Sequence, residues 1–269
     1  MTKKLLFILT ITFYMSLSYI NAQGLYIDIQ TGYNVGMNSY IPNFYNSSDA
    51  SVTNSSSSNI KTIAPVTLGS GFNFAGNIGY MITKNMGTEL GFSYQIGSKS
   101  KADNTFYDGS NFFHQTTSIY ANNCQIIPTL IFTLGLEKLN PYVKVGLLMN
   151  IGTITINSTD GYHSQEMKLT NGFDVGLLTT VGIVRKVTDK ISVFGELRII
   201  NSNCTPLKGT IVSDTYYGND NLPYLTTNDK EIIYGNTSEA TQSSEPSQQL
   251  KTSYSINSVG INLGLKIKI

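Results

Sequence analysis

The chain has 269 residues, of which 13% are charged, with a formal net charge of +1 and a mean hydropathy of -0.05. Such a balanced charge gives no reason to expect a nucleic acid or an acidic surface as a partner. No segment reaches the length of about 20 apolar residues that a transmembrane helix needs, so a membrane-integral form of this chain must be a β-barrel.

The N-terminus has the order of regions found in a secretory signal peptide. Lys3 and Lys4 precede an apolar run from Leu5 to Met15, and a small residue, Ala22, follows. The run is too short for a permanent helical anchor. We therefore predict a cleavable signal peptide over residues 1–22 and a mature domain over residues 23–269, with secretion through the inner membrane.

Eight segments after the signal peptide alternate apolar and polar residues with the period of two that is typical of β-strands. In the last segment every odd-numbered residue from Val259 to Ile269 is apolar, and the even-numbered residues are Gly, Asn or Lys. In chain order the segments are Leu25–Met37, Gly71–Ile82, Met86–Gly97, Cys124–Leu134, Tyr142–Thr155, Gly172–Val184, Ile191–Ile200 and Val259–Ile269.

The connections between these segments are alternately long and short. The short ones are Thr83–Asn85, Gly135–Pro141 and Arg185–Lys190. The long ones are Asn38–Ser70, Ser98–Asn123, Ile156–Asn171 and Asn201–Ser258. Tight turns on one side and long loops on the other are typical of transmembrane β-barrels. We predict an all-β fold: an eight-stranded antiparallel up-and-down transmembrane β-barrel with four long extracellular loops and both mature ends at the periplasmic side.

A soluble β-sandwich is the alternative, because it also alternates apolar and polar residues. Its polar face would meet water, where glycine only weakens a strand. Here the polar face is rich in glycine, including Gly32, Gly79, Gly91, Gly182 and Gly264. Small residues inside a narrow barrel leave room for larger neighbours, so the glycines favour the barrel.

Charged residues of both signs fall on the face predicted to line the barrel interior. Isolated buried charges are costly, so charges of both signs in one narrow tube are expected to pair. We predict that this ion-paired network closes the lumen. Its members are Asp28, Glu89, Lys144, Asp174, Glu196, Arg198 and Lys266.

Four stretches of the chain resemble a known family. They are Gly24–Gly36, the run Ile127-Pro-Thr-Leu, the run from Asn140 to Gly146, and the closing Gly260–Ile269, which reads Gly-Ile-Asn-Leu-Gly-Leu-Lys-Ile-Lys-Ile. They are similar to the bacterial outer membrane protein β-barrel domain family, the small eight-stranded barrels of OmpA/OmpX type, and the signal looks like those of Bacteroidetes. The resemblance implies a location in the bacterial outer membrane, with outer-membrane lipid and the insertion machinery as partners. Such barrels usually end in an aromatic residue that the insertion machinery recognises, whereas Ile269 stands here, so the resemblance implies the fold more firmly than it implies efficient insertion.

Some small outer-membrane barrels that resemble this chain are lipid-modifying enzymes. They act through a set of serine, histidine and acid or through a histidine near the outer leaflet. This chain has two histidines, His114 and His163, both in long connections. A histidine together with Ser110 or Ser164 and with Glu166 or Asp108 could form a triad, but such neighbours are expected by chance in connections rich in Ser, Thr and Asp. We therefore predict no enzyme activity, no cofactor and no metal.

Cys124 lies in the fourth predicted strand and Cys204 just beyond the seventh. Strands three apart exceed disulfide reach across the membrane span, so we expect unpaired thiols, and a bridge would require both residues to rise above the barrel rim and bend inward.

The long connections carry whatever specificity the protein has. Asn46–Asn59 is a polar tract that we expect to be flexible. Asp214–Gln249 mixes tyrosines with small polar residues, a composition that suits contact with a host or surface ligand. The leading functional hypothesis is a closed barrel that serves envelope structure and surface interaction. The alternative is a narrow channel for small solutes.

Overall fold

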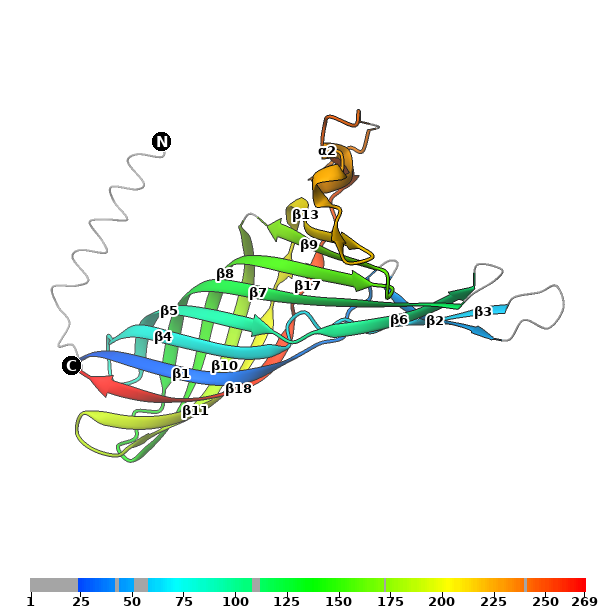
Figure 1. Cartoon of the computed structure of the whole chain (residues 1–269). Coiled ribbons are helices and arrows are strands. Elements are labelled where there is room, and N and C mark those ends of the chain that lie inside the picture. Colours follow the sequence, from blue (N-terminus) through cyan, green and yellow to red (C-terminus); the bar gives the residue numbers. More distant parts are fainter. Residues whose placement is uncertain (1–23, 42–43, 51–57, 108–111, 172, 240) are drawn as a thin grey trace, which may run out of the picture.

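A computed structural model describes residues 24–41, 44–50, 58–107, 112–171, 173–239 and 241–269. The predicted signal peptide lies outside the described residues. Eight long antiparallel strands form the body of the molecule (Figure 1). They are β1 (Gly24–Gly36), β4 (Gly71–Met81), β5 (Met86–Gly97), β7 (Phe112–Thr133), β8 (Leu139–Thr159), β10 (Asp174–Lys186), β11 (Ile191–Asn201) and β18 (Ser258–Lys268).

These eight strands close into a barrel. The ring order is β1, β4, β5, β7, β8, β10, β11 and β18, and β18 pairs with β1 to complete it. Residue-to-residue partners followed once round the ring lead from Tyr26 to Gly36 on the same strand, a stagger of ten residues. A stagger of this kind means that the strands are tilted against the barrel axis. The predicted fold class is confirmed.

The three tight turns lie at one end of the barrel, which we call the short-turn end. They cover residues 82–85, 134–138 and 187–190. The first and last strands also meet there, because the Ile269 backbone N–H donates to the Leu25 carbonyl at 2.9 Å. Figure 1 shows the C-terminus at this end and the long connections at the opposite end. The predicted alternation of short and long connections is confirmed.

The two faces of the wall sort as the sequence pattern predicts. On β18 the Leu263 side chain is 66% exposed on the outside, whereas its neighbour Asn262 is 0% exposed inside. Glycines on the inner face make room for large side chains: a Cβ at Gly264 would collide with the ring of Phe194. The outside of the barrel is therefore apolar, and the inside is packed with mainly polar side chains.

The long connections contain further strands. β7 and β8 extend beyond the barrel and pair there with β6 (Ser100–Tyr107) and β9 (His163–Asn171). The tract expected to be flexible forms the paired strands β2 (Tyr45–Ala50) and β3 (Ser58–Ile63), and its residues 51–57 lie outside the described part. Backbone pairing along the free ends of β7 and β8 orders these connections, although their side chains are polar.

The last long connection holds the remaining elements. Its strands are β12 (Asn203–Cys204), β13 (Pro206–Tyr216), β14 (Asn219–Asp220), β15 (Glu231–Gly235), β16 (Ser247–Leu250) and β17 (Tyr254–Ser255). Its helices are η1 (Leu222–Tyr224) and α2 (Thr227–Lys230). Within the described ranges, no helix has the length and apolar character needed to cross a membrane.

An apolar core fills the long-connection end of the barrel. It joins residues from the connections, such as Val66, Leu68 and Ile256, to Ile119 and Ile154 on the extended parts of β7 and β8. All five side chains are buried. The connections therefore share an apolar core at the barrel mouth, and we call the four long connections together the cap.

Candidate functional site

The same three residue types occur twice inside the barrel, on directly paired positions of three adjacent strands. Tyr26, Gly79 and Glu89 are partners across β1, β4 and β5. The Tyr26 hydroxyl donates to Glu89 Oε1 at 2.6 Å. Its ring lies over Gly79, where a Cβ would collide with it. The glycine thus allows the tyrosine to reach the carboxylate across the intervening strand.

The second set lies four strands further round the ring. Tyr142, Gly182 and Glu196 are partners across β8, β10 and β11. The Tyr142 hydroxyl donates to Glu196 Oε2 at 2.9 Å, and its ring covers Gly182. The two sets occupy equivalent places in the two halves of an eight-stranded ring.

Lys144 joins the two sets across the lumen. Its Nζ lies 2.8 Å from Glu89 Oε2 and 3.3 Å from Glu196 Oε2. Lys266 Nζ lies 3.6 Å from Glu89 Oε1 and stacks 3.9 Å from the centre of the Tyr26 ring. We call Glu89, Lys144, Glu196 and Lys266 the ionic layer. Its buried charges are paired, which is the condition under which such burial is tolerated.

Two further predicted members, Asp28 and Arg198, lie inside the lumen without an ion pair to the ionic layer among the described residues. Asp28 accepts a hydrogen bond from the Asn77 amide. Arg198 donates from Nη1 to Asn73 Oδ1 at 3.1 Å, at the start of a buried group of amide side chains. The other buried amides are Asn34, Gln95, Asn123, Gln125, Asn150 and Asn262.

Asp174 lies apart from the ionic layer. It is directly paired with Asn150, six residues along β8 from Lys144, which corresponds to about 20 Å of strand. There Asp174 Oδ2 accepts a hydrogen bond from the Thr205 backbone N–H at 2.9 Å. The structure thus brings Glu89, Lys144, Glu196 and Lys266 together directly, with Asp28 and Arg198 close by.

Sequence reasoning missed the tyrosines and the amides of this network. The sequence did indicate their side of the wall, because Tyr26 and the amides fall on the alternate strand positions that face the lumen. Which carboxylate each tyrosine meets depends on the pairing register between strands, and that register cannot be read from a single segment.

Buried side chains occupy the lumen between the ionic layer and the cap, among them Asn123, Leu148 and Asn150. A second apolar group, made of Ile127, Leu148, Leu178 and Ile200, fills the section beside the buried amides. The cavity lined by Lys144, Glu196 and Arg198 has a volume of about 10 Å³, the space of about one water molecule.

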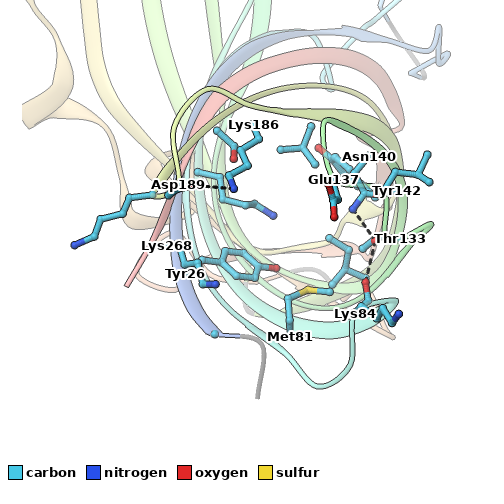
Figure 2. Close-up of a pocket in the computed structure, with 17 residues that line it drawn as sticks. Tyr26, Met81, Lys84, Thr133, Glu137, Asn140, Tyr142, Lys186, Asp189 and Lys268 are labelled. Carbon is cyan, nitrogen blue, oxygen red and sulfur yellow. Dashed lines mark hydrogen bonds and ion pairs between the residues drawn. The ribbon is translucent and has the colours of Figure 1, made fainter. Parts of the chain in front are cut away.

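The short-turn end opens instead into a cavity of about 290 Å³, which we call the vestibule (Figure 2). The rings of Tyr26 and Tyr142 lie at its inner end, together with Met81. Lysines and two acidic residues surround its mouth, and Lys186 Nζ pairs there with Asp189 Oδ1 at 2.7 Å. The vestibule is therefore a blind pocket with an apolar inner end and a charged rim.

A second polar cluster lies on the cap, around Asp214 of β13. Its Oδ2 accepts from Gln165 Nε2 at 2.8 Å and lies 3.0 Å from His163 Nε2, and its Oδ1 accepts from Asn221 at 2.9 Å. Burial acts to raise the pKa of Asp214, but these hydrogen bonds outweigh it and hold the pKa below its usual value.

The two histidines are partnered by groups other than a serine. His163 contacts Asp214, and His114 Nδ1 lies 3.0 Å from the Thr105 hydroxyl. Asp108 and Ser110 lie outside the described residues. In the described part of the chain, no three His, Cys, Asp or Glu side chains are grouped as metal ligands. The absence of enzyme activity stays a prediction.

Both cysteines are free, which confirms the expectation of unpaired thiols. Cys124 is exposed, and Cys204 belongs to the apolar core of the cap. Burial raises the pKa of the Cys204 thiol to about 12.

Comparison with known proteins gives a structural likeness only. No protein-family model matches the chain, and no curated protein matches it. The crystal structure of neisserial surface protein A (NspA) is similar to 93% of this chain over 99% of its own length, at 11% sequence identity and a TM-score of 0.39. Membership of the outer membrane protein β-barrel domain family stays a prediction, and the fold assignment rests on the strand pairing itself.

Proposed function

We propose that this protein is an outer-membrane β-barrel with a closed, ion-paired lumen, which serves envelope structure and contacts surface ligands through its cap. The observation that carries the proposal is the contrast between the two faces of the wall. Side chains fill the barrel interior from the ionic layer to the cap, whereas the outer face of the wall carries a band of exposed apolar side chains.

The apolar band supports the location in the outer membrane. Exposed apolar side chains follow one another along the outer face of each barrel strand, as Ile261, Leu263, Leu265 and Ile267 do on β18. Soluble monomers rarely expose apolar patches larger than a few hundred Å². Contact with membrane lipid shields this apolar band from water. A barrel inserted in the outer membrane depends on the outer-membrane insertion machinery for its assembly.

The cap supports the surface-interaction part of the proposal. Tyr162, Tyr216 and Tyr217 pack edge-on and tilted against one another, with ring centres 5.0 and 4.7 Å apart, while each remains more than half exposed. Tyr217 has a φ of +50°, which is rare for a bulky residue. A bulky residue with a positive φ costs folding free energy. An exposed tyrosine at this position is therefore better explained by a contact surface than by a role in folding. Tyr234, by contrast, is buried in the core of the cap.

Conductance of the refolded protein in a planar bilayer tests the closed lumen. Because the interior beyond the vestibule leaves only about 10 Å³ beside the ionic layer, we expect no steady single-channel current. Steady openings of uniform size would support the narrow channel instead. A variant in which Lys144→Ala removes the bridge between Glu89 and Glu196 is the positive control, because it should admit water and raise the frequency of current events.

A further inference from the structure

We infer that the vestibule at the short-turn end is a binding site for a small organic anion, a molecule with a short apolar body and a phosphate or carboxylate group. The inference goes beyond the proposed function, since neither envelope structure nor surface contact uses this end of the barrel. It also does not depend on the lumen being closed.

The charges around the vestibule are out of balance. Two of its lysines are already engaged: Lys186 pairs with Asp189 at 2.7 Å, and Lys266 pairs with Glu89 of the ionic layer at 3.6 Å. The remaining charged residues in its lining are Lys84, Lys190, Lys268 and Glu137.

Three amines thus face one carboxylate. Within the described part of the chain, none of Lys84, Lys190 and Lys268 forms an ion pair. Figure 2 shows Lys84 and Lys268 at the rim, on either side of the opening. Mobile ammonium groups gathered round a concave surface attract anions and fix their orientation.

The inner end of the vestibule is apolar. The Tyr26 and Tyr142 rings close it, and Met81, Ile131 and Val184 line it. Both tyrosine hydroxyls are bonded to glutamates and both rings are buried, so the accessible apolar surface comes from the partly buried Met81 and Val184. A volume of about 290 Å³ is at the lower limit of small-molecule sites, which restricts the ligand to a small body.

The rim and the inner end together define the ligand. An inorganic anion would meet the lysines but leave the apolar end unfilled, and a neutral apolar molecule would leave the lysines unpaired. A small apolar body with one anionic group satisfies both, with its charge at the rim and its body against Met81 and Val184.

Methionine-methyl NMR in nanodiscs of zwitterionic lipid tests the site directly. Met81 lines the vestibule, whereas Met149 lies on β8 outside it, so the Met149 signal is an internal reference. Phenyl phosphate is the probe, and benzyl alcohol has a similar apolar body without the charge. We expect phenyl phosphate to shift the Met81 signal saturably, and benzyl alcohol to have little effect.

Charge variants separate a specific site from general attraction. The double variant Lys84→Gln/Lys268→Gln should weaken phenyl phosphate binding about tenfold, because two favourable charge contacts are lost. Lys138→Gln is the matched control: it lies in the same turn as Glu137 but does not line the vestibule, so binding should be unchanged. These lysines are exposed, and a folded-barrel gel shift verifies that every variant is intact.

Three results would overturn the inference: no saturable shift of Met81, equal binding of benzyl alcohol, or equal affinity in the double variant and the wild type. A conducting lumen in the bilayer experiment would contradict the closed barrel and leave this site standing, so the two failures are distinguishable.

Discussion

Lys144 holds two carboxylates that come from opposite halves of the barrel wall, and its side chain is 4% exposed. Removing one partner from a buried charge network is far more costly than removing the whole network, because the remaining charges stay desolvated. At the scale of single residues, Lys144 is therefore the interior side chain whose loss should be felt most.

We predict that Lys144→Met lowers the free energy of unfolding by about 3–5 kcal/mol, measured by urea titration in lipid vesicles. Methionine keeps much of the volume and removes the charge, so Glu89 and Glu196 lose their shared partner. The double variant Lys144→Met/Glu196→Gln should recover part of the loss, since the new amide would carry no charge and could still accept from Tyr142. An unchanged urea midpoint in the single variant would contradict this account of the ionic layer.

Gly79 is the second residue whose identity is fixed by a close contact, because the Tyr26 ring occupies the space of a Cβ there. We predict that Gly79→Ala costs about 1–3 kcal/mol by overpacking. Gly76 is a matched control on the same strand: a Cβ there would meet its nearest atom, the Asp28 carbonyl oxygen, at 3.7 Å, which is an ordinary contact. Gly76→Ala should leave the urea midpoint nearly unchanged, and equal effects at both glycines would refute the role of the Tyr26 contact.

At the scale of elements, the Asp214 carboxylate ties β9 to β13 and to the segment that follows β13. Its pKa is lower in the folded cap than its ordinary value of 3.8, because hydrogen bonds to the charged form outweigh the effect of burial. A depressed pKa means that the stabilisation is complete above the ordinary pKa and is lost as the pH falls through the folded pKa.

We predict that Asp214→Asn weakens amide-exchange protection in β9 and β13 by about 1–3 kcal/mol at neutral pH. In the wild type the protection, corrected for intrinsic exchange rates, should fall only below pH 3.8, and in the variant it should not depend on pH in this range. The barrel strands β1 and β18 are the internal control. A wild-type loss that begins near neutral pH would mean that another group controls the cap.

At the scale of the whole molecule, the barrel strands were readable from sequence and the cap was not. The period of two assigns both the strands and their faces, because one face of every barrel strand is apolar. β1 begins one residue before the predicted segment, and β18 ends one residue before Ile269. The tract that contains β2 and β3 lacks that signal, since its residues are mostly Ser, Asn and Thr. β2 and β3 pair with each other, and a single residue pair, Ser47 with Asn104, joins β2 to β6, so backbone pairing orders these strands without an apolar pattern in the sequence.

The residues of the barrel interior were likewise predicted only in part. The inner parity predicted that Glu89, Lys144, Glu196 and Lys266 share one lumen, because each falls on the polar face of its strand. The alternation did not distinguish Asp174 from the ionic layer, because Asp174 also faces the lumen but lies further along the barrel axis. The position of a residue along the barrel axis depends on the stagger between neighbouring strands. The total stagger is defined only when all eight strands close into a ring.

The repeated tyrosine, glycine and glutamate make the barrel nearly two-fold symmetric about its axis, and the charges beside them break that symmetry. Asp28 follows Tyr26 by two residues, and Lys144 follows Tyr142 by two residues, so equivalent places in the two halves carry opposite charges. A barrel assembled from two identical four-stranded chains would carry the same charge at both places and would set like charges against each other. The two halves of this chain differ in sequence, so one half is acidic at this place and the other is basic. The bridge that Lys144 forms between Glu89 and Glu196 across the lumen depends on this difference between the halves.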